Sequence, residues 1–143
     1  MADQRDIEVA REFVEAFNAA DWPRFRATLA ADVLYEEAGT GRRVQGAEEY
    51  VRLSQGWKEA FSDARGTVWT TLAGDGTVAQ ELVWEGTHSG PLAGPTGALP
   101  PSGRQISVAG TLWYAFEAGR VRSIRHHLDV MTMMQQIGAG SQP

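Results

Sequence analysis

The chain has 143 residues, of which 43% are apolar and none is cysteine, and its formal net charge is −5. A chain of this length forms one domain whose core is large enough to need no disulfides. The absence of cysteine excludes disulfide scaffolds, thiolate metal sites and cysteine nucleophiles. The acidic balance and the scattered arginines disfavour nucleic-acid binding, which depends on a positive surface.

The sequence predicts neither a secretory signal nor a membrane span. Residues 1–6 lack the basic and then apolar order of a signal peptide. No run of roughly 18 apolar residues occurs, so we expect no membrane contact. These features favour a cytoplasmic protein that acts on small molecules.

The first part of the chain is predicted to be mainly helical. Apolar residues spaced by three and four place Phe13 and Phe17 on one face of a helix over residues 3–20. Asp21 is predicted to cap a short second helix. The elements that follow are a brief strand over 32–35, a glycine-marked loop to residue 46 and a third helix over 47–60.

After the third helix the apolar period changes from about 3.6 to about 2, which indicates strands. Strands are predicted over residues 67–72, 78–85, 106–116 and 120–128, with a loop over 89–103 and a tail helix over 131–137. Because helices precede strands, the predicted class is α+β, with N-terminal helices packed on a strongly curved, mostly antiparallel sheet. We expect one domain over residues 1–138 and a disordered tail over 139–143.

A sheet that curves strongly leaves a conical cavity that the helices do not close. Residues of one strand parity are then expected to face this cavity. The inward-facing polar and aromatic residues expected on the two long strands are Gln80, Trp84 and His88 on the first and Arg125, His127 and Asp129 on the last. A bulge in either strand would reverse the assignment beyond it.

Several short segments occur together in a recognisable order. They are residues 13–22, 60–63, 74–75, 86–92 and 101–104, and then Asp129 followed by 136–138. In this order they resemble the SnoaL-like polyketide cyclase (ester cyclase) family of the NTF2-like superfamily, over nearly the whole chain. The resemblance implies a cone-shaped α+β domain, and it says less about the reaction, because one such fold hosts many chemistries.

The resemblance implies a cofactor-free enzyme that closes a polyketide ring by intramolecular aldol condensation, as in antibiotic biosynthesis. An aspartate at the position of Asp129 would remove a proton from an activated carbon and later protonate the carbonyl oxygen. Partial desolvation would raise the pKa of this carboxyl and suit it to general base catalysis. Where relatives often read His-Trp-Asp, residues 124–126 read Ile-Arg-His, and an arginine near Asp129 would lower that pKa.

The candidate catalytic residues are therefore Asp129, His127 and His88. Each has a structural alternative, because Asp129 could cap the tail helix and His88 could bond to loop backbone. His126 and His127 are neighbours on one strand and point to opposite faces, so they cannot hold one metal ion between them. The sequence predicts no metal site.

The candidate substrate-binding residues share an aromatic, apolar or hydrogen-bonding side chain on an expected inward face. They are Phe13, Phe17, Tyr35, Trp57, Gln80, Trp84, Arg125 and Met134. The structural alternative is core packing for the tryptophans and the methionine. The expected ligand is a small hydrophobic or aromatic molecule, while Glu36 and Glu37 are expected to be solvated.

Two other functions fit the same pattern. One is a cofactor-independent hydroxylase or epoxide hydrolase, in which Arg125 and Asp129 would supply two members of an Asp-Arg-Asp relay. The other is a non-catalytic module for ligand binding or dimerisation. A homodimer or higher homo-oligomer is expected in each case, because the convex face of the sheet would otherwise expose apolar residues such as Trp113.

Overall fold

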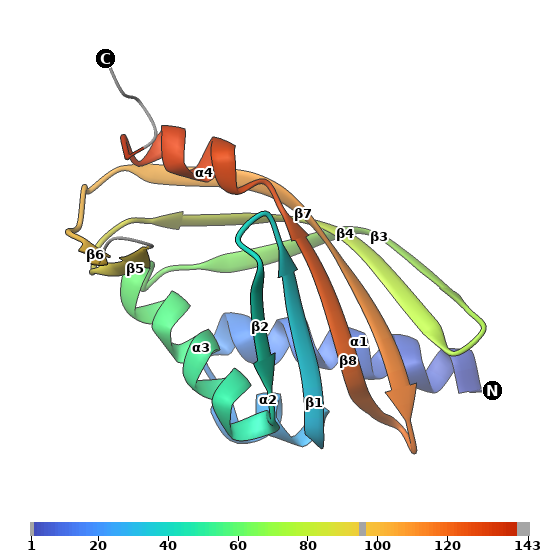
Figure 1. Cartoon of the computed structure of the whole chain (residues 1–143). Coiled ribbons are helices and arrows are strands. Elements are labelled where there is room, and N and C mark those ends of the chain that lie inside the picture. The colour runs from blue at the N-terminus through green and yellow to red at the C-terminus, as the bar shows by residue number, and fades with distance from the viewer. Residues whose placement is uncertain (1, 95–96, 140–143) are drawn as a thin grey trace.

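The computed structural model describes residues 2–94 and 97–139. The elements in chain order are α1 (Ala2–Ala19), α2 (Trp22–Ala27), β1 (Leu29–Ala38), β2 (Arg42–Gln45), α3 (Ala47–Ala60), β3 (Arg65–Gly74), β4 (Thr77–Thr87), β5 (Leu92–Gly94), β6 (Gly97–Leu99), β7 (Gln105–Glu117), β8 (Arg120–Leu128) and α4 (Val130–Gln136). The α+β prediction is confirmed, since the first three helices lie against one curved sheet (Figure 1).

Six strands form this sheet in the order β2-β1-β8-β7-β4-β3, and β5 and β6 pair separately. β1 and β8 are parallel, whereas the other pairs in the sheet are antiparallel. α1 crosses the inner face near β3 and β4, α3 lies beside β1 and β2, and α4 covers the far end of β7 (Figure 1). No helix in the two described ranges is long and apolar enough to cross a membrane.

The sequence around Asp21 sets where helix α2 begins. Asp21 caps α2 as predicted, because its carboxylate accepts the backbone N–H of Arg24 at 3.3 Å. Pro23 lies in the first turn of that helix, where a missing N–H leaves no bond unmade. The inward face of α1 carries Phe13, whose ring lies 4.7 Å from the ring of Phe25 on α2.

Aromatic rings join the helices to the sheet. The ring of Phe13 meets that of Tyr114 on β7 edge to face at 5.4 Å, and the ring of Tyr50 on α3 stacks on that of Tyr35 on β1 at 4.5 Å. Such pairs contribute roughly 0.5–1.5 kcal/mol beyond the burial of their area. The inner layer is therefore built from large, stiff side chains that leave space between them.

Three strands lie where the sequence predicts loop, and the predicted strands β1, β3, β4 and β7 are all longer than predicted, β1 most of all. β1 spans ten residues rather than residues 32–35, and β2 pairs with its outer edge. β2 has four residues with one exposed side and only Val44 as an apolar residue, so its pattern carries no strand signal. β5 and β6 are short strands of three residues each, and they pair in antiparallel fashion inside the predicted loop over 89–103.

A bulge in β8 reverses the predicted parity of that strand. The pairing with β7 matches Ala115 with Ser123 and Phe116 with Val121, which leaves Arg122 as an extra residue. Beyond this point His126 is buried, whereas Arg125 and His127 are exposed. The predicted inward orientation of Arg125 and His127 is therefore wrong.

The predicted disordered tail over 139–143 lies outside the described residues from residue 140 onward. Ala139 itself is still attached to α4, because its backbone N–H donates to the carbonyl of Met134 at 2.9 Å. It also packs against the apolar cluster that holds Met133 and Ile137.

Two leucines on neighbouring strands test this description of the core. Leu82 is 0% exposed and Leu72 is 69% exposed. Leu82→Ala should lower the free energy of unfolding by about 2–5 kcal/mol, because it leaves a cavity in the core. Leu72→Ala should change it by no more than about 0.5 kcal/mol. Urea denaturation followed by circular dichroism measures both, and equal effects would contradict the assigned faces of the sheet.

Candidate functional site

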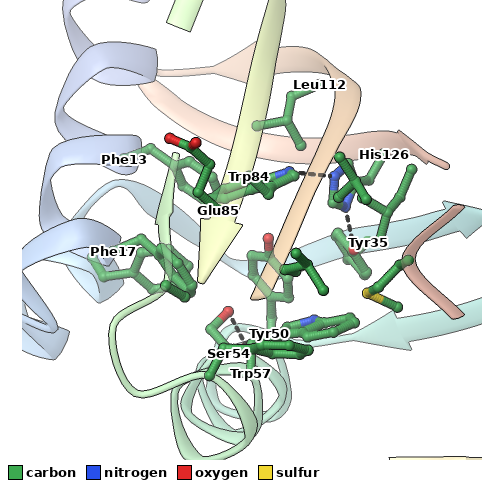
Figure 2. A pocket seen from close by; sticks show the side chains of 17 residues that line it. Phe13, Phe17, Tyr35, Tyr50, Ser54, Trp57, Trp84, Glu85, Leu112 and His126 are labelled. Carbon is green, nitrogen blue, oxygen red and sulfur yellow. Dashed lines mark hydrogen bonds between the residues drawn. The ribbon is translucent and has the colours of Figure 1, made fainter. Parts of the chain in front are cut away.

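A narrow cavity of about 70 Å³ lies between the helices and the inner face of the sheet. Helices α1 and α3 supply aromatic walls, and the sheet supplies Tyr35, Trp84, Leu112 and His126 (Figure 2). Met133 on α4 closes one side. Ligand pockets commonly measure 300–1,000 Å³, so a bulky ligand would have to displace some of these side chains.

Five of the predicted substrate-binding side chains line this cavity. They are Phe13, Phe17, Tyr35, Trp57 and Trp84. Figure 2 shows the two phenylalanines projecting from α1 and Trp57 lying flat beside Tyr50 on α3. Helical spacing and strand alternation are sufficient to place these residues. The register shift on β1 lies between Leu29 and Leu34, before the regular alternation of Val33, Tyr35 and Glu37.

The other three predicted substrate-binding residues are not part of the cavity lining. Gln80 is buried on the inward face, but its amide oxygen accepts the hydroxyl of Tyr114 at 2.5 Å. Arg125 lies on the outer face, where its guanidinium sits 5.9 Å from the ring centre of Trp113. Met134 is half-buried in the neighbouring apolar cluster, and Met133 takes the cavity position one residue earlier.

A chain of hydrogen bonds crosses the wall of the cavity. The indole N–H of Trp84 donates to Nε2 of His126 at 3.1 Å, and Nδ1 of His126 lies 2.7 Å from the hydroxyl of Tyr35 (Figure 2). The Tyr35 hydroxyl donates to Oε2 of Glu37 at 2.5 Å. The hydroxyl of Thr40 donates to the other carboxylate oxygen at 2.7 Å.

The direction of this chain follows from its two ends. An indole nitrogen can only donate, so Nε2 of His126 is the acceptor and carries no proton. The neutral imidazole therefore holds its proton on Nδ1, which donates to the Tyr35 hydroxyl. An ionised Glu37 can only accept, so Tyr35 must donate toward it. Both ends require the same tautomer of His126.

Burial keeps the imidazole of His126 neutral. Desolvation lowers the pKa of His126 to about 4, against a smaller raising effect of Glu37. Burial also raises the pKa of the Tyr35 hydroxyl well above its usual value. At neutral pH the wall thus presents a neutral imidazole beside a neutral phenol.

Glu37 was expected to be solvated, and this expectation is wrong. Its side chain is 2% exposed because it shares the inward parity of Val33 and Tyr35 along β1. The alternation Val33-Tyr35-Glu37 is visible in the sequence and could have identified it. A brief strand over 32–35 ends too early to include it.

Asp129 lies outside the cavity as the N-cap of α4. Its carboxylate accepts the backbone N–H of Thr132 at 3.1 Å and the Thr132 hydroxyl at 2.7 Å. These hydrogen bonds lower the pKa of the Asp129 carboxyl, and the side chain is exposed. The geometry is that of helix capping. Asp129 and Arg125 therefore bring no acid–base pair into the cavity for an epoxide-opening relay.

His88 and His127 are also absent from the cavity lining. His88 is buried in the loop after β4, where its Nδ1 accepts the backbone N–H of Ser102 at 3.2 Å and lies 3.0 Å from the Ser102 hydroxyl. Burial lowers the pKa of His88. His127 is exposed on the outer face of β8.

The segment over 86–92 joins β4 to the end of α3. Asp63 accepts the backbone N–H of Thr87 at 2.7 Å and its hydroxyl at 2.9 Å. Gly90 lies so close to α3 that an added Cβ would come within 2.1 Å of the carbonyl oxygen of Glu59. The segment over 86–92, which contributes to the resemblance, therefore requires a glycine at position 90 for packing. Its contacts connect β4 to α3, and none of its residues lines the cavity described above.

The segment over 136–138 has a comparable role at the other end of the sheet. Its Gln136 amide accepts the backbone N–H of Ser107 at 2.8 Å and donates to the Ser107 carbonyl at 3.0 Å. The Gln136 amide thereby makes the two hydrogen bonds that a residue of a neighbouring strand would make with β7. These hydrogen bonds hold α4 in place beside the cavity.

Helices that enclose an aromatic cavity against a curved sheet define the fold class of this domain, and the comparisons with known proteins identify its family. The chain matches the SnoaL-like polyketide cyclase model over residues 7–137 and belongs to that family. It is similar to an NTF2-like protein from Burkholderia pseudomallei K96243, with 21% identity, a TM-score of 0.77 and coverage of 94% of this chain and 98% of that one. The predicted NTF2-like fold is confirmed.

Two further solved structures carry cyclase descriptions. A candidate SnoaL-like polyketide cyclase from Jannaschia sp. CCS1 has 19% identity and a TM-score of 0.86, with coverage of 99% of this chain and 95% of that one. IdmH, a candidate polyketide cyclase from Streptomyces antibioticus, has 26% identity and a TM-score of 0.79, with coverage of 93% and 98%. The comparison with curated proteins gives no match.

The neutral state of His126 predicts how stability depends on pH. A histidine with a folded pKa of about 4 and an ordinary value of 6.5 binds more protons when the chain unfolds. The free energy of unfolding should therefore fall as the pH drops from about 6.5 to about 4, by up to about 3 kcal/mol from this residue. Denaturant titrations across this range on the native chain and on His126→Gln measure the effect.

The histidine next along the strand provides the control. His127→Gln changes an exposed ring and should leave the slope of stability against pH as it is in the native chain. A native slope that survives in His126→Gln would show that another group produces it.

Proposed function

We propose that this protein is a cofactor-independent enzyme that activates a carbon acid for intramolecular, aldol-type ring closure, with His126 as its general acid and base. The observation that carries the proposal is the neutral imidazole in an aromatic cavity, with its unprotonated Nε2 beside the indole N–H of Trp84. Membership of the SnoaL-like polyketide cyclase family supports the reaction class.

The pair of Trp84 and His126 supplies both groups that enolisation needs. In the structure the indole N–H donates to Nε2. A substrate carbonyl that enters between the rings takes this hydrogen bond onto its oxygen, which frees Nε2 to remove a proton from the adjacent carbon. The C–H electron pair moves into the enolate, and the indole N–H stabilises the charge on oxygen. The enolate carbon then attacks a second carbonyl of the same molecule.

The proton on Nε2 completes the cycle. Attack on the second carbonyl places negative charge on its oxygen, and His126 returns the proton there to give a hydroxyl group. The aromatic walls hold the two reacting carbons together and exclude water, which favours the ring over hydrolysis or exchange. The small volume of the cavity, about 70 Å³, favours a flat and compact substrate.

A single variant series tests this role. His126→Gln should lower the rate of deuterium exchange from heavy water into the methyl group of acetophenone by about 10²–10⁴-fold, the usual range for general acid–base catalysis. Binding of acetophenone, followed by tryptophan fluorescence, should remain within a few-fold of the native value. Proton NMR of the methyl signal measures the exchange.

Asp129→Asn and His127→Gln serve as matched controls, because each replaces a candidate acid–base group that lies outside the cavity lining. Both should exchange the probe at nearly the native rate. Loss of exchange in Asp129→Asn with native exchange in His126→Gln would transfer the role to Asp129 and refute the assignment to His126.

A non-catalytic ligand-binding function is the second candidate. The specific observation in its favour is that both nitrogens of His126 already have partners, Trp84 and Tyr35. If the indole keeps its bond to Nε2 when a ligand binds, no base is available. Acetophenone would then bind and be recovered without deuterium from the native protein at every pH.

We also propose that a second copy of the chain packs on the outer face of the sheet. Pairing across the strands aligns Leu72, Ala79 and Trp113 in one row on that face. Arg125 extends this row, and Glu81 lies in the next row of the outer face. In a two-fold related pair, Arg125 of one copy would therefore lie near Glu81 of the other. The exposed side chains of Leu72 and Trp113 would be covered.

Light scattering at micromolar concentration tests the proposed dimer. The native chain should have twice the mass of one 15.6 kDa chain. Trp113→Glu should yield the single mass, because it places a carboxylate in the centre of the apolar row. A single mass for the native chain would refute the proposal.

A further inference from the structure

We propose that Glu37 is a positioning residue that acts on His126 through Tyr35 and receives the proton that leaves the imidazole. The inference rests on the proposed function of His126 and adds a route for its proton. The geometry carries it, because one unbroken set of hydrogen bonds joins the cavity wall to the Glu37 carboxylate.

Glu37, Tyr35 and His126 lie on one face of the sheet and are joined by hydrogen bonds. Glu37 is 2% exposed and is absent from the lining of the aromatic cavity. A buried carboxylate in this position has no contact with a substrate, yet it is two hydrogen bonds from the imidazole.

Charged side chains surround the end of β1 that holds Glu37. Arg42, Arg43 and Arg125 line one recess with Glu37 and with the exposed His127. Arg43 is also paired with Glu36 at 3.2 Å. The other groups that face the network are the Thr40 hydroxyl and the phenol of Tyr50, whose ring stacks on that of Tyr35 from α3.

The relay step moves three protons in one direction. The substrate proton passes to Nε2 of His126, the Nδ1 proton passes to the oxygen of Tyr35, and the Tyr35 hydroxyl proton passes to Oε2 of Glu37. The products are an enolate, an imidazole protonated only on Nε2, an unchanged phenol and a neutral carboxyl group. Each bond broken is matched by one formed, and no oxidant or reductant takes part.

This step avoids an ion that the cavity wall does not support. Without the relay, proton abstraction would leave an imidazolium among aromatic side chains, where its charge is poorly solvated. With the relay, the proton rests on the Glu37 carboxyl group and returns along the same hydrogen bonds when the second carbonyl oxygen takes it up. The imidazole stays neutral in both halves of the cycle.

Glu37→Gln tests the relay, and Glu36→Gln is the matched control. Both substitutions replace one carboxylate by an amide on the same strand, but Glu36 points away from Tyr35 and pairs with Arg43. Nitrogen-15 NMR of labelled histidine reports the tautomer of His126 without any substrate. The native chain and Glu36→Gln should show the proton on Nδ1.

In Glu37→Gln the introduced amide can donate to the Tyr35 oxygen, so the Tyr35 hydroxyl can turn and donate to Nδ1. It then competes with the Trp84 indole, which still favours the Nδ1–H form, and a mixture of the two tautomers should appear. Exchange of the Nδ1 proton of His126 should slow by about tenfold or more, because the charged acceptor that draws this proton along the chain is lost, and a hydrogen bond to such a group contributes about 1.5–3 kcal/mol. Tyr35→Phe, which removes the middle of the chain, should slow it equally. Thermal unfolding confirms that each variant is folded.

The proposal is overturned if Glu37→Gln and Tyr35→Phe both retain the native histidine spectrum and the native exchange rate. It is also overturned if Glu36→Gln changes them as much as Glu37→Gln does. A failure of the proposed function is seen differently, as native deuterium exchange into acetophenone by His126→Gln, and that result leaves the tautomer measurement unchanged.

Discussion

The donor and acceptor roles in the hydrogen bonds of the cavity wall are set by the two groups at its ends, because each of these groups can take only one role. The Trp84 indole can only donate, and an ionised Glu37 can only accept. His126 and Tyr35 lie between them and could each bond in either direction, but the ends leave one consistent arrangement. A buried network in which every member is satisfied is stiff, because any rotation leaves a polar group without a partner in apolar surroundings. The basic nitrogen is therefore held toward the cavity before any ligand arrives.

The rest of the domain supports this arrangement from a distance. Tyr35 cannot tilt away, because Tyr50 on α3 stacks on its ring. The position of α3 is set in turn at its C-terminal end, where the segment over 86–92 bonds to Asp63 and approaches Glu59 closely. The segments over 86–92 and 136–138, which contribute to the resemblance, thus hold neighbouring elements together. The groups that would perform chemistry lie outside these segments in the sequence.

Regular periodicity explains which features the sequence predicts and which it does not. The face of α1 that carries Phe13 and the cap at Asp21 depend on neighbours within a few residues, so local patterns suffice for them. The extent of β1 depends on pairing with β8 and β2, and these contacts are distant in sequence. The inward direction of His126 depends on one extra residue near the β7–β8 turn, and no local pattern of residue types marks that residue as extra.

The bulge at Arg122 also decides which charge β8 presents to the cavity. Because side chains alternate along a strand, a slip that pairs Arg122 with Ala115 and moves each later residue of β8 one place along β7 would exchange the two faces of the strand. His126 would turn outward, and Arg125 and His127 would turn inward, so the same strand would offer a permanent cation where a neutral base now stands. Removal of Arg122, in contrast, would close the bulge and leave the pairings of Ser123 and Ile124 as they are. One residue without a partner on β7 therefore keeps a permanent cation out of the cavity.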